Sequence, residues 1–450
     1  MKRLNTINKA SFAIFFAALV WISGCNIIDI EDRADPNNTE LQVVLDNPSR
    51  PNLSTLAVGT VSGMRVDMRI WFINHGMIGR EMYRFLSAEP RNTGDLLGKE
   101  NSQLDPGSFY TTRPWSAYYA NIRMANILIQ AASNSPAVNA EELNGILGFA
   151  KTIKAYQYLL ALNLTNNNGI RRQVTDDINA VGDMLSKPDG FALIESLLDE
   201  AYTDLDNAEF IFNLPPGFSG FDDSEGFQQF NRALQARVAA YQMSDWQAVL
   251  DALDNSFIDE DGSLATGVYH DFTTQPNDET NPVFADPQAG SGDSWVAHPS
   301  FVADAENGDA RVDEKVELRE SEAALDGLSS NYGLAVYDSP TASIPIIRNA
   351  ELILLRAEAL INRNQGSDLD DAEDLLNIVR NAADLPDYSG STTQAALTNE
   401  MLNQRRYELF FEGHRWIDMR RYDRLDNLPI DRSGDNVWIS FPIPEAENVN

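Results

Sequence analysis

The sequence predicts a mainly α-helical protein in which about four pairs of helices stack into a repeat scaffold that carries a loop-rich, irregular subdomain. Three observations lead to this fold class. Apolar residues recur at three- and four-residue spacing in several long runs. Small residues, mostly alanine, occupy the positions where neighbouring helices would touch. Two long stretches, residues 67–113 and 254–346, interrupt the helical pattern with glycine, proline and scattered aromatic residues.

The composition describes a large, globular and strongly acidic chain. It has 450 residues, 43% of them hydrophobic, which is enough for a large core or two subdomains. Its 67 acidic and 34 basic residues give a formal net charge of -33. Such a field repels polyanions, so nucleic acid and anionic lipid surfaces are poor partners for this chain.

The first element along the chain is a predicted lipoprotein signal peptide, residues 1–24. Lys2, Arg3 and Lys9 precede an apolar run over residues 13–22, and Ser23-Gly24-Cys25 follows. The alternative is a transmembrane anchor, but the run is about half as long as the roughly 20 residues that a spanning helix needs. We therefore expect cleavage before Cys25 and lipidation of its sulfur. Residues 25–45 then form a polar, acidic tether.

Cys25 is the only cysteine in the chain. A disulfide framework and a cysteine-ligated metal site are therefore both excluded.

The helical runs beyond the tether fall into pairs. The predicted pairs are residues 115–130 with 141–164, 191–212 with 231–243, 246–253 with a helix near residue 347, and 369–383 with 398–422. Alanine at close-packing positions fits a tetratricopeptide-like arrangement. The spacing alone leaves the type of repeat open.

The last hundred residues hold the strongest helical patterns. Residues 348–359 read RNAELILLRAEA, residues 369–380 read LDDAEDLLNIVR, and residues 403–421 read NQRRYELFFEGHRWIDMRR. None contains proline, and each places apolar residues on one stripe.

These three segments, closed by WISFPIPEAE at residues 438–447, resemble the C-terminal half of the SusD/RagB family of nutrient-binding outer-membrane lipoproteins. Residues 115–128 (WSAYYANIRMANIL) and 148–164 (GFAKTIKAYQYLLALNL) are similar to two helices of the family's N-terminal half. The resemblance makes the tetratricopeptide-like scaffold the expected one. It divides the chain into a SusD-like N-terminal region (46–253), a loop-rich insertion (254–346) and a C-terminal helical region (347–450). The sequence ends sooner after Pro444 than is usual in the family, so the docking of the C-terminus is an open question.

The resemblance also implies a function and a location. The chain would be anchored by lipid to the outer membrane, exposed on the cell surface, and would bind a nutrient without cleaving it. The ligand would be an oligosaccharide or, in some members, a peptide, and it would be passed to a TonB-dependent SusC-like transporter. The acidic surface favours a neutral glycan over a polyanionic one.

The two irregular stretches supply the candidate ligand residues. A glycan site needs aromatic rings that stack on sugar faces beside side chains that hydrogen-bond to hydroxyl groups. The candidates are Trp71, Asn74, Arg80, Tyr83, Phe85, Trp295 and Tyr332. For each aromatic residue the competing interpretation is core packing, and for Trp115, Tyr119, Trp416 and Trp438 packing is the favoured one.

The sequence does not support an enzyme or a cofactor. The four histidines have no metal-ligand spacing, and no GxSxG, Walker or GxGxxG motif occurs. Residues 259–262 resemble part of a calcium loop, but Phe257 stands where that loop needs its first ligand. A structural calcium ion held by loop acids stays an open alternative. Two other functions also stay open: a surface lipoprotein glycoside hydrolase and a helical-repeat adaptor that binds only protein.

Overall fold

The computed structural model describes residues 45–173, 180–290 and 292–447. From residue 47 onward, the described residues fold as one unit. The predicted signal peptide, Cys25 and all of the tether except its last residue lie outside the described residues. Within the described ranges, none of the helices combines the length and apolar character that crossing a bilayer requires.

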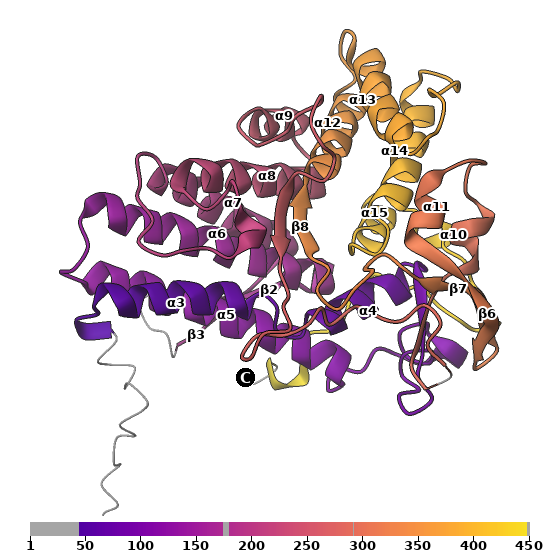
Figure 1. Ribbon diagram of the computed structural model, residues 1–450, viewed down its shortest axis with the longest axis horizontal. Coiled ribbons are helices and arrows are strands. Elements are labelled where there is room, and N and C mark those ends of the chain that lie inside the picture. The colour runs from indigo at the N-terminus through magenta and orange to yellow at the C-terminus, as the bar shows by residue number, and fades with distance from the viewer. Residues whose placement is uncertain (1–44, 174–179, 291, 448–450) are drawn as a thin grey trace, which may run out of the picture. The chain divides into compact units, whose positions relative to one another are not determined.

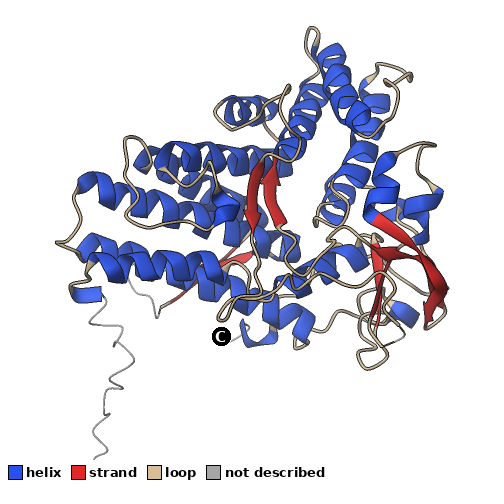
Figure 2. Cartoon of the chain, viewed as in Figure 1, coloured by secondary structure: helices blue, strands red, loops and turns tan. Residues whose placement is uncertain are grey.

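Helices are the main secondary structure of the unit (Figure 2). They are α3 (Arg50–Gly63), α4 (Met68–Ile78), α5 (Phe109–Asn134), α6 (Ala140–Thr165), α7 (Lys187–Asp204), α8 (Ser224–Gln242), α9 (Trp246–Asp254), α10 (Pro299–Ala303), α11 (Ala310–Lys315), α12 (Asn349–Arg363), α13 (Asp368–Ala382), α14 (Gln394–Glu408) and α15 (Arg415–Arg421). Each helix from α5 to α9 packs on the next, α9 packs on α12, and α12 packs on both α13 and α14 (Figure 1). The predicted fold class, a tetratricopeptide-like helical scaffold with an irregular subdomain, is confirmed.

Polar caps fix where the long helices begin. Ser49 and Asn139 form capping boxes with residues three positions on, so that backbone N–H groups at the starts of α3 and α6 have acceptors. The side chains of Ser186, Asp223 and Thr393 accept hydrogen bonds at the starts of α7, α8 and α14. The short polar turns between paired helices therefore also stabilise the helix ends.

Helix α12 lies at the centre of the C-terminal half. It packs on α8, α9, α13 and α14, and nearly all of its residues are buried. Ala350, Ala357 and Ala359 have no exposed surface, and their small side chains let the neighbouring helices approach closely. This is the role that the sequence predicted for the small residues of this segment.

The strands form three small sheets. The strands are β1 (Met82–Phe85), β2 (Ile170–Gln173), β3 (Val181–Leu185), β4 (Gly267–His270), β5 (Ser294–Ala297), β6 (Val316–Leu325), β7 (Leu328–Leu334) and β8 (Ile344–Arg348). One sheet has the order β1-β5-β7-β6, and the others pair β2 with β3 and β4 with β8, all antiparallel. The stretch 254–346, predicted to be loop-rich, thus holds most of the strands as well as α10 and α11.

Three expectations about individual elements were wrong. Residues 67–113 are not wholly irregular, because the apolar run MRIWFINHGMI forms helix α4 and β1 follows it. Helix α7 ends at Asp204 rather than near residue 212. The rings of Phe210 and Phe212 instead pack on each other and on Phe149 of α6, at centroid distances of 4.9 Å for the first contact and 4.8 Å for Phe149 with Phe212.

The third error concerns the predicted helix over residues 398–422, which the structure divides into α14 and α15. Phe411 and Gly413 adopt left-handed backbone conformations, with φ of 59° and 86°. The chain breaks here because the indole of Trp71 from α4 lies directly against Gly413: a Cβ at that position would lie 2.0 Å from Trp71 Cη2. The tertiary contact therefore overrides the helical pattern.

The C-terminal segment, residues 428–447, runs across both halves of the unit. Trp438 donates its indole N–H to the carbonyl of Asp95 at 2.8 Å, and the backbone N–H of Phe441 donates to Leu164 at the end of α6. Trp115 of α5 donates its indole N–H to the carboxylate of Glu447 at 3.0 Å. The C-terminus is therefore docked as far as the described residues extend, with Trp115 and Trp438 in packing positions.

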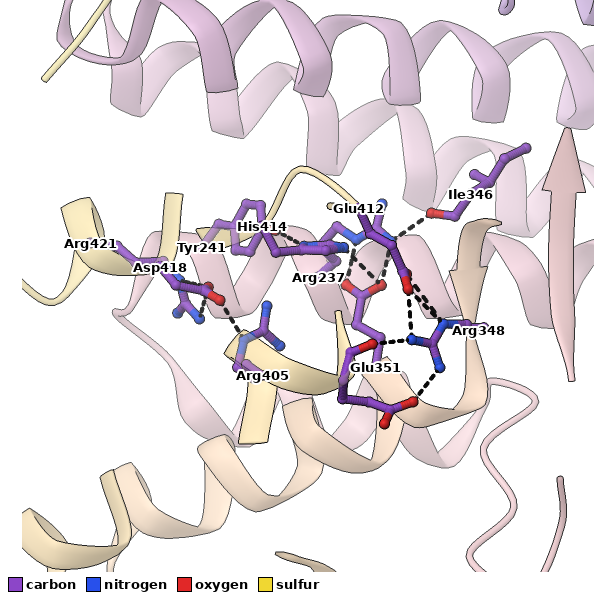
Figure 3. Close-up of polar contacts among 11 residues, drawn as sticks. Arg237, Tyr241, Ile346, Arg348, Glu351, Arg405, Glu412, His414, Asp418 and Arg421 are labelled. Atoms are coloured by element: carbon purple, nitrogen blue, oxygen red, sulfur yellow. Dashed lines mark hydrogen bonds and ion pairs between the residues drawn. The ribbon is translucent and has the colours of Figure 1, made fainter. Parts of the chain in front are cut away.

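Buried ion pairs join the C-terminal helices to each other (Figure 3). Arg237 of α8 makes two hydrogen bonds to the Glu351 carboxylate of α12, at 2.7 and 2.5 Å. Arg348 reaches from the end of β8 to Glu408 and Glu412, each at 2.7 Å. These contacts link β8, α8, α12 and the end of α14.

A second group of buried charges fixes α15. Asp418 accepts hydrogen bonds from Arg405 of α14 at 2.7 Å and from Arg421 at 2.9 Å. Arg421 also pairs with Glu358 of α12, whose side chain is completely buried. The charged residues of the NQRRYELFFEGHRWIDMRR segment therefore connect separate elements, instead of pairing only along one helix.

We predict that Gly413→Ala lowers the thermal midpoint. The new methyl group would meet Trp71 in addition to the strain of a left-handed backbone, which by itself costs on the order of 1 kcal/mol. Gly308→Ala is the matched control, because Gly308 has φ of 92° and open space around its Cα. Thermal unfolding followed by circular dichroism measures both variants, and equal midpoints for the two would contradict the packing argument.

Candidate functional site

Four of the predicted ligand residues lie on one sheet. Tyr83 and Phe85 are on β1, Trp295 is on β5 and Tyr332 is on β7. Tyr83, Phe85 and Trp295 are almost completely buried in the core that surrounds the sheet. Tyr332 is partly exposed and lies opposite Leu318, whose exposed fraction is 69%. The structure thus brings these residues together, but only Tyr332 reaches solvent.

Two arginines and an aspartate cover Trp295. The guanidinium carbons of Arg69 and Arg84 lie 5.0 and 5.4 Å from the centroid of the indole ring. Asp293 accepts hydrogen bonds from both arginines and from the indole N–H of Trp295. Side chains of this chain therefore contact both the face of the Trp295 ring and its indole N–H.

The remaining predicted ligand residues lie on α4 and in the turn after it. Asn74 is completely buried and donates to the carbonyl of Tyr110 at 2.8 Å. The Trp71 ring lies tilted against the ring of His75 with centroids 4.1 Å apart, and it borders a small cavity of about 40 Å³. Such a cavity has room for a few water molecules but none for a sugar ring.

Arg80 has a clear structural partner. Its Nε donates to the carbonyl of Pro429 at 3.0 Å and its Nη2 to that of Asn436 at 2.8 Å. This buried guanidinium fastens the C-terminal segment to the end of α4. The ligand role of the predicted residues stays a prediction, and this arrangement gives most of them packing or positioning roles.

An open groove of a size suited to sugars lies elsewhere, beside the C-terminal half of α3. We call it the α3 groove; its volume is about 510 Å³, within the range of small-molecule sites. It is lined by Val58, Val61, Ser62, Arg65, Asn213, Leu214, Pro215, Pro216, Phe218, Tyr269, His270, Asp271, Phe272, Thr273, Asp278, Thr341 and Ser343. Four stretches far apart in the sequence therefore meet at one surface.

The walls of the α3 groove combine apolar and hydrogen-bonding groups. The apolar part of the lining includes Val58, whose exposed fraction is 47%, and the proline pair Pro215 and Pro216. Hydroxyl and amide groups of Ser62, Asn213, Thr273, Thr341 and Ser343 complete the lining. A sugar presents apolar C–H faces and polar edges, and this mixture of walls matches both.

Arg65 holds the loop that closes one end of the α3 groove. It donates from Nη1 to the carbonyl of Asp271 at 2.6 Å, and its Nη2 pairs with Asp278 at 2.9 Å. Thr273 donates its hydroxyl to the other oxygen of Asp278 at 2.8 Å. Burial lowers the pKa of neighbouring His270 to about 3, so this imidazole is neutral at pH 7.

Two other open grooves have less suitable walls. One, of about 450 Å³ between α9, α12 and α13, is lined chiefly by charged side chains. Its Arg356 already pairs with Asp254 and Glu260. The other, of about 480 Å³, lies between residues 87–99 and the turn of the β6–β7 hairpin, and has no aromatic ring in its lining. The α3 groove is the candidate functional site.

The histidines and acids do not assemble into a metal site in the described part of the chain. There, no group of three or more histidine, cysteine, aspartate or glutamate residues is placed to hold an ion. Each of His75, His298 and His414 instead has a hydrogen-bonding partner within the fold, such as Tyr241 for His414 at 3.0 Å. The structural calcium ion considered from the sequence stays a prediction.

Comparisons with known proteins agree with this fold. Residues 335–444 match the SusD family, over β8, α12 to α15 and most of the C-terminal segment. A SusD-like protein from Formosa agariphila is 23% identical over an alignment of 398 positions, and the match covers 74% of this chain and 76% of that protein. The resemblance to the SusD/RagB family is confirmed.

Solved structures show that the SusD fold extends over nearly the whole chain. Surface glycan-binding protein A from Bacteroides thetaiotaomicron superposes with a TM-score of 0.70 over 90% of this chain and 97% of its own, at 12% identity. A SusD superfamily protein from Bacteroides vulgatus gives a TM-score of 0.65 over 89% of this chain and 96% of its own, at 16% identity. At identities this low, the superpositions establish the fold of this chain alone.

Sequence reasoning missed the α3 groove altogether. Val58, Val61 and Ser62 share one face of a helix, and this spacing was visible, but Val58 reads as an ordinary core residue. The proline pair at 215–216 was visible as a turn signal. Nothing in the sequence indicates that these positions meet residues 269–278 and 341–343.

We predict that the SusD-like chain loses stability steadily as the pH falls below 6.5. Burial lowers the pKa of His75 and His270 to about 3 and that of His414 to about 4, from 6.5 in the unfolded chain. Between those values the unfolded chain binds protons that the folded chain does not, so acid favours unfolding, by about 1.4 kcal/mol per shifted pKa unit. The thermal midpoint measured from pH 3 to pH 7 should therefore rise with pH.

Glu81 gives this pH profile an internal control. Burial raises the pKa of Glu81 to about 7 from 4.5, so its contribution to stability is present at low pH and is lost as the pH rises through 7. Glu81→Gln removes this opposing effect, so the midpoint of the variant should rise more steeply between pH 4.5 and 7 than that of the wild type. A flatter profile in the variant would show that Glu81 is ionised in the folded protein.

Proposed function

We propose that this chain is a cell-surface lipoprotein that binds an oligosaccharide in the α3 groove and delivers it to a TonB-dependent SusC-like transporter in the outer membrane. The observation that carries the proposal is the SusD fold over nearly the whole chain, shared with surface glycan-binding protein A, together with the SusD family match in its C-terminal part. We propose the α3 groove as the site on this molecule where the ligand binds.

The chemistry of the α3 groove supports a glycan ligand. Its apolar wall of valine, leucine and proline offers a surface for the C–H face of a sugar ring. Its hydroxyl, amide and carboxylate groups offer donors and acceptors for ring hydroxyls, and carboxylates accept from hydroxyl groups especially well. A volume of about 510 Å³ accommodates a short oligosaccharide.

The distribution of charged groups fits a protein that binds its ligand without cleaving a bond in it. The carboxylates whose pKa is strongly lowered, Glu351, Glu408 and Asp418, are all buried and paired with arginine. Burial favours the neutral form of each, but the arginines outweigh it and lower each pKa to about 2. These groups stabilise the fold, and we infer no catalytic role for them.

The lipid anchor completes the proposal. A diacylglycerol on Cys25 with an additional acyl chain buries more methylene groups than the single chain that gives only marginal binding. The anchor would hold the binding unit at the outer membrane, where a transporter can receive the ligand. Incorporation of labelled palmitate, lost in Cys25→Ala, tests this part of the proposal.

We predict that the purified protein binds neutral oligosaccharides in isothermal titration and releases no new reducing ends from them. Ser62→Trp should weaken binding at least tenfold, because Ser62 is exposed and lines the groove, so a large ring there occupies the ligand's volume. Thr55→Trp is the control, since Thr55 is exposed on the same helix outside the groove.

Each alternative function gives a different result in this experiment. Turnover of a bound glycan would identify a hydrolase. A protein that binds none of a broad set of malto-, cello-, xylo-, manno- and galacto-oligosaccharides would contradict the glycan proposal and leave a protein-binding adaptor. Equal loss of binding in both tryptophan variants would move the site away from the α3 groove.

A further inference from the structure

We infer that Arg65 and the two carboxylates that hold it, Asp278 and Glu279, make the α3 groove select uncharged glycans and reject uronic or sulfated ones. The inference rests on the proposed function, and it adds the charge class of the ligand and the residues that set it. It follows from how the guanidinium of Arg65 is engaged by its neighbours.

All three nitrogen atoms of the Arg65 guanidinium face acceptors of this chain. Nη1 donates to the carbonyl of Asp271, Nη2 pairs with Asp278, and Nε lies 3.5 Å from a carboxylate oxygen of Glu279. The guanidinium carbon lies 5.6 Å from the centroid of the Phe272 ring, which supports it from one side. The side chain is only 17% exposed. An anionic ligand would have to displace one of these partners to reach Arg65.

Arg65 is the only arginine or lysine among the described residues that line the α3 groove. The lining also contains Asp271 and Asp278, and Glu279 lies beside it. Burial works to raise the pKa of Asp278, but hydrogen bonds from the Glu279 backbone and from Arg65 lower it, so Asp278 is ionised at pH 7. His270 carries no compensating positive charge at that pH.

The groove therefore carries more negative than positive charge, and the guanidinium of Arg65 is already bound to acceptors of this chain. A uronate or sulfate group entering it would lose part of its hydration without gaining a charge-assisted hydrogen bond. Two fixed carboxylates would also repel it. A neutral sugar meets neither obstacle, and its hydroxyl groups can donate to Asp271 and Asp278. The charges of the groove therefore distinguish neutral from anionic glycans in two ways. They repel the anionic glycan, and they attract the hydroxyl groups of the neutral one.

The decisive experiment releases Arg65. In the double variant Asp278→Asn/Glu279→Gln, both ion-pairing partners lose their charge but keep their size, so Nη2 and Nε become available to a ligand. The probes are oligogalacturonate and the same oligomer with its carboxyl groups methyl-esterified, which differ in charge on one skeleton. We expect the double variant to bind oligogalacturonate at least tenfold more tightly than the wild type does, as one new charge-assisted hydrogen bond allows.

The control has the same change in net charge outside the groove. Asp370→Asn/Asp374→Asn neutralises two exposed carboxylates on α13, and it should leave oligogalacturonate binding at the wild-type level. An equal gain in this control would show that the overall charge of the protein, and not Arg65, excludes anions. The single variant Asp278→Asn repeats the test with less disturbance of the loop, and thermal melting checks that each variant is folded.

The outcomes separate this inference from the proposed function. Wild-type protein that binds oligogalacturonate as tightly as its methyl ester, or a double variant with no gain, would overturn the inference and leave glycan binding intact. Failure of the wild type to bind any glycan would instead contradict the proposed function. A gain confined to the double variant would support the role of Arg65 even where the methyl ester itself binds weakly.

Discussion

The pairing of buried arginines with buried carboxylates is the interaction on which the rest of this structure depends. Arg237, Arg348, Arg405 and Arg421 each reach a carboxylate on a different element, so the pairs connect α8, β8, α12, α14 and α15. Leaving one member of such a pair unpartnered costs about 3 to 5 kcal/mol. The partners must therefore come together in one arrangement, and that requirement fixes how the C-terminal helices meet.

This constraint determines where the irregular segments can lie. Arg348 anchors the end of β8 to Glu408 and Glu412, and β8 pairs with β4, whose last residue is His270 in the α3 groove. Trp71 lies against Gly413, one residue beyond Glu412, which ties α4 to the same corner. The groove is thus formed by loops whose ends are held by the charged core.

Charge has two opposite roles in this molecule. In the core, arginine neutralises carboxylates so completely that Glu351, Glu408 and Asp418 stay ionised to a pH of about 2. At the surface, the excess of acidic residues gives the net charge of -33 and keeps polyanions away. The α3 groove combines both effects, because Arg65 is engaged by acceptors of this chain while Asp271 and Asp278 belong to the groove lining. Our proposal of selectivity for uncharged glycans rests on this arrangement.

The sequence by itself predicted most of the helices, their order and the resemblance to the SusD/RagB family, because amphipathic periodicity and motif order are local properties. It also predicted that the segment NQRRYELFFEGHRWIDMRR is central. Only the tertiary structure decided that Phe411 and Gly413 break that segment, since the break exists to admit Trp71 from a helix more than three hundred residues earlier. Likewise, aromatic residues such as Tyr83 and Trp295 look alike in a sequence whether they bind sugar or fill a core. Burial distinguishes the two, and burial depends on which distant segments meet.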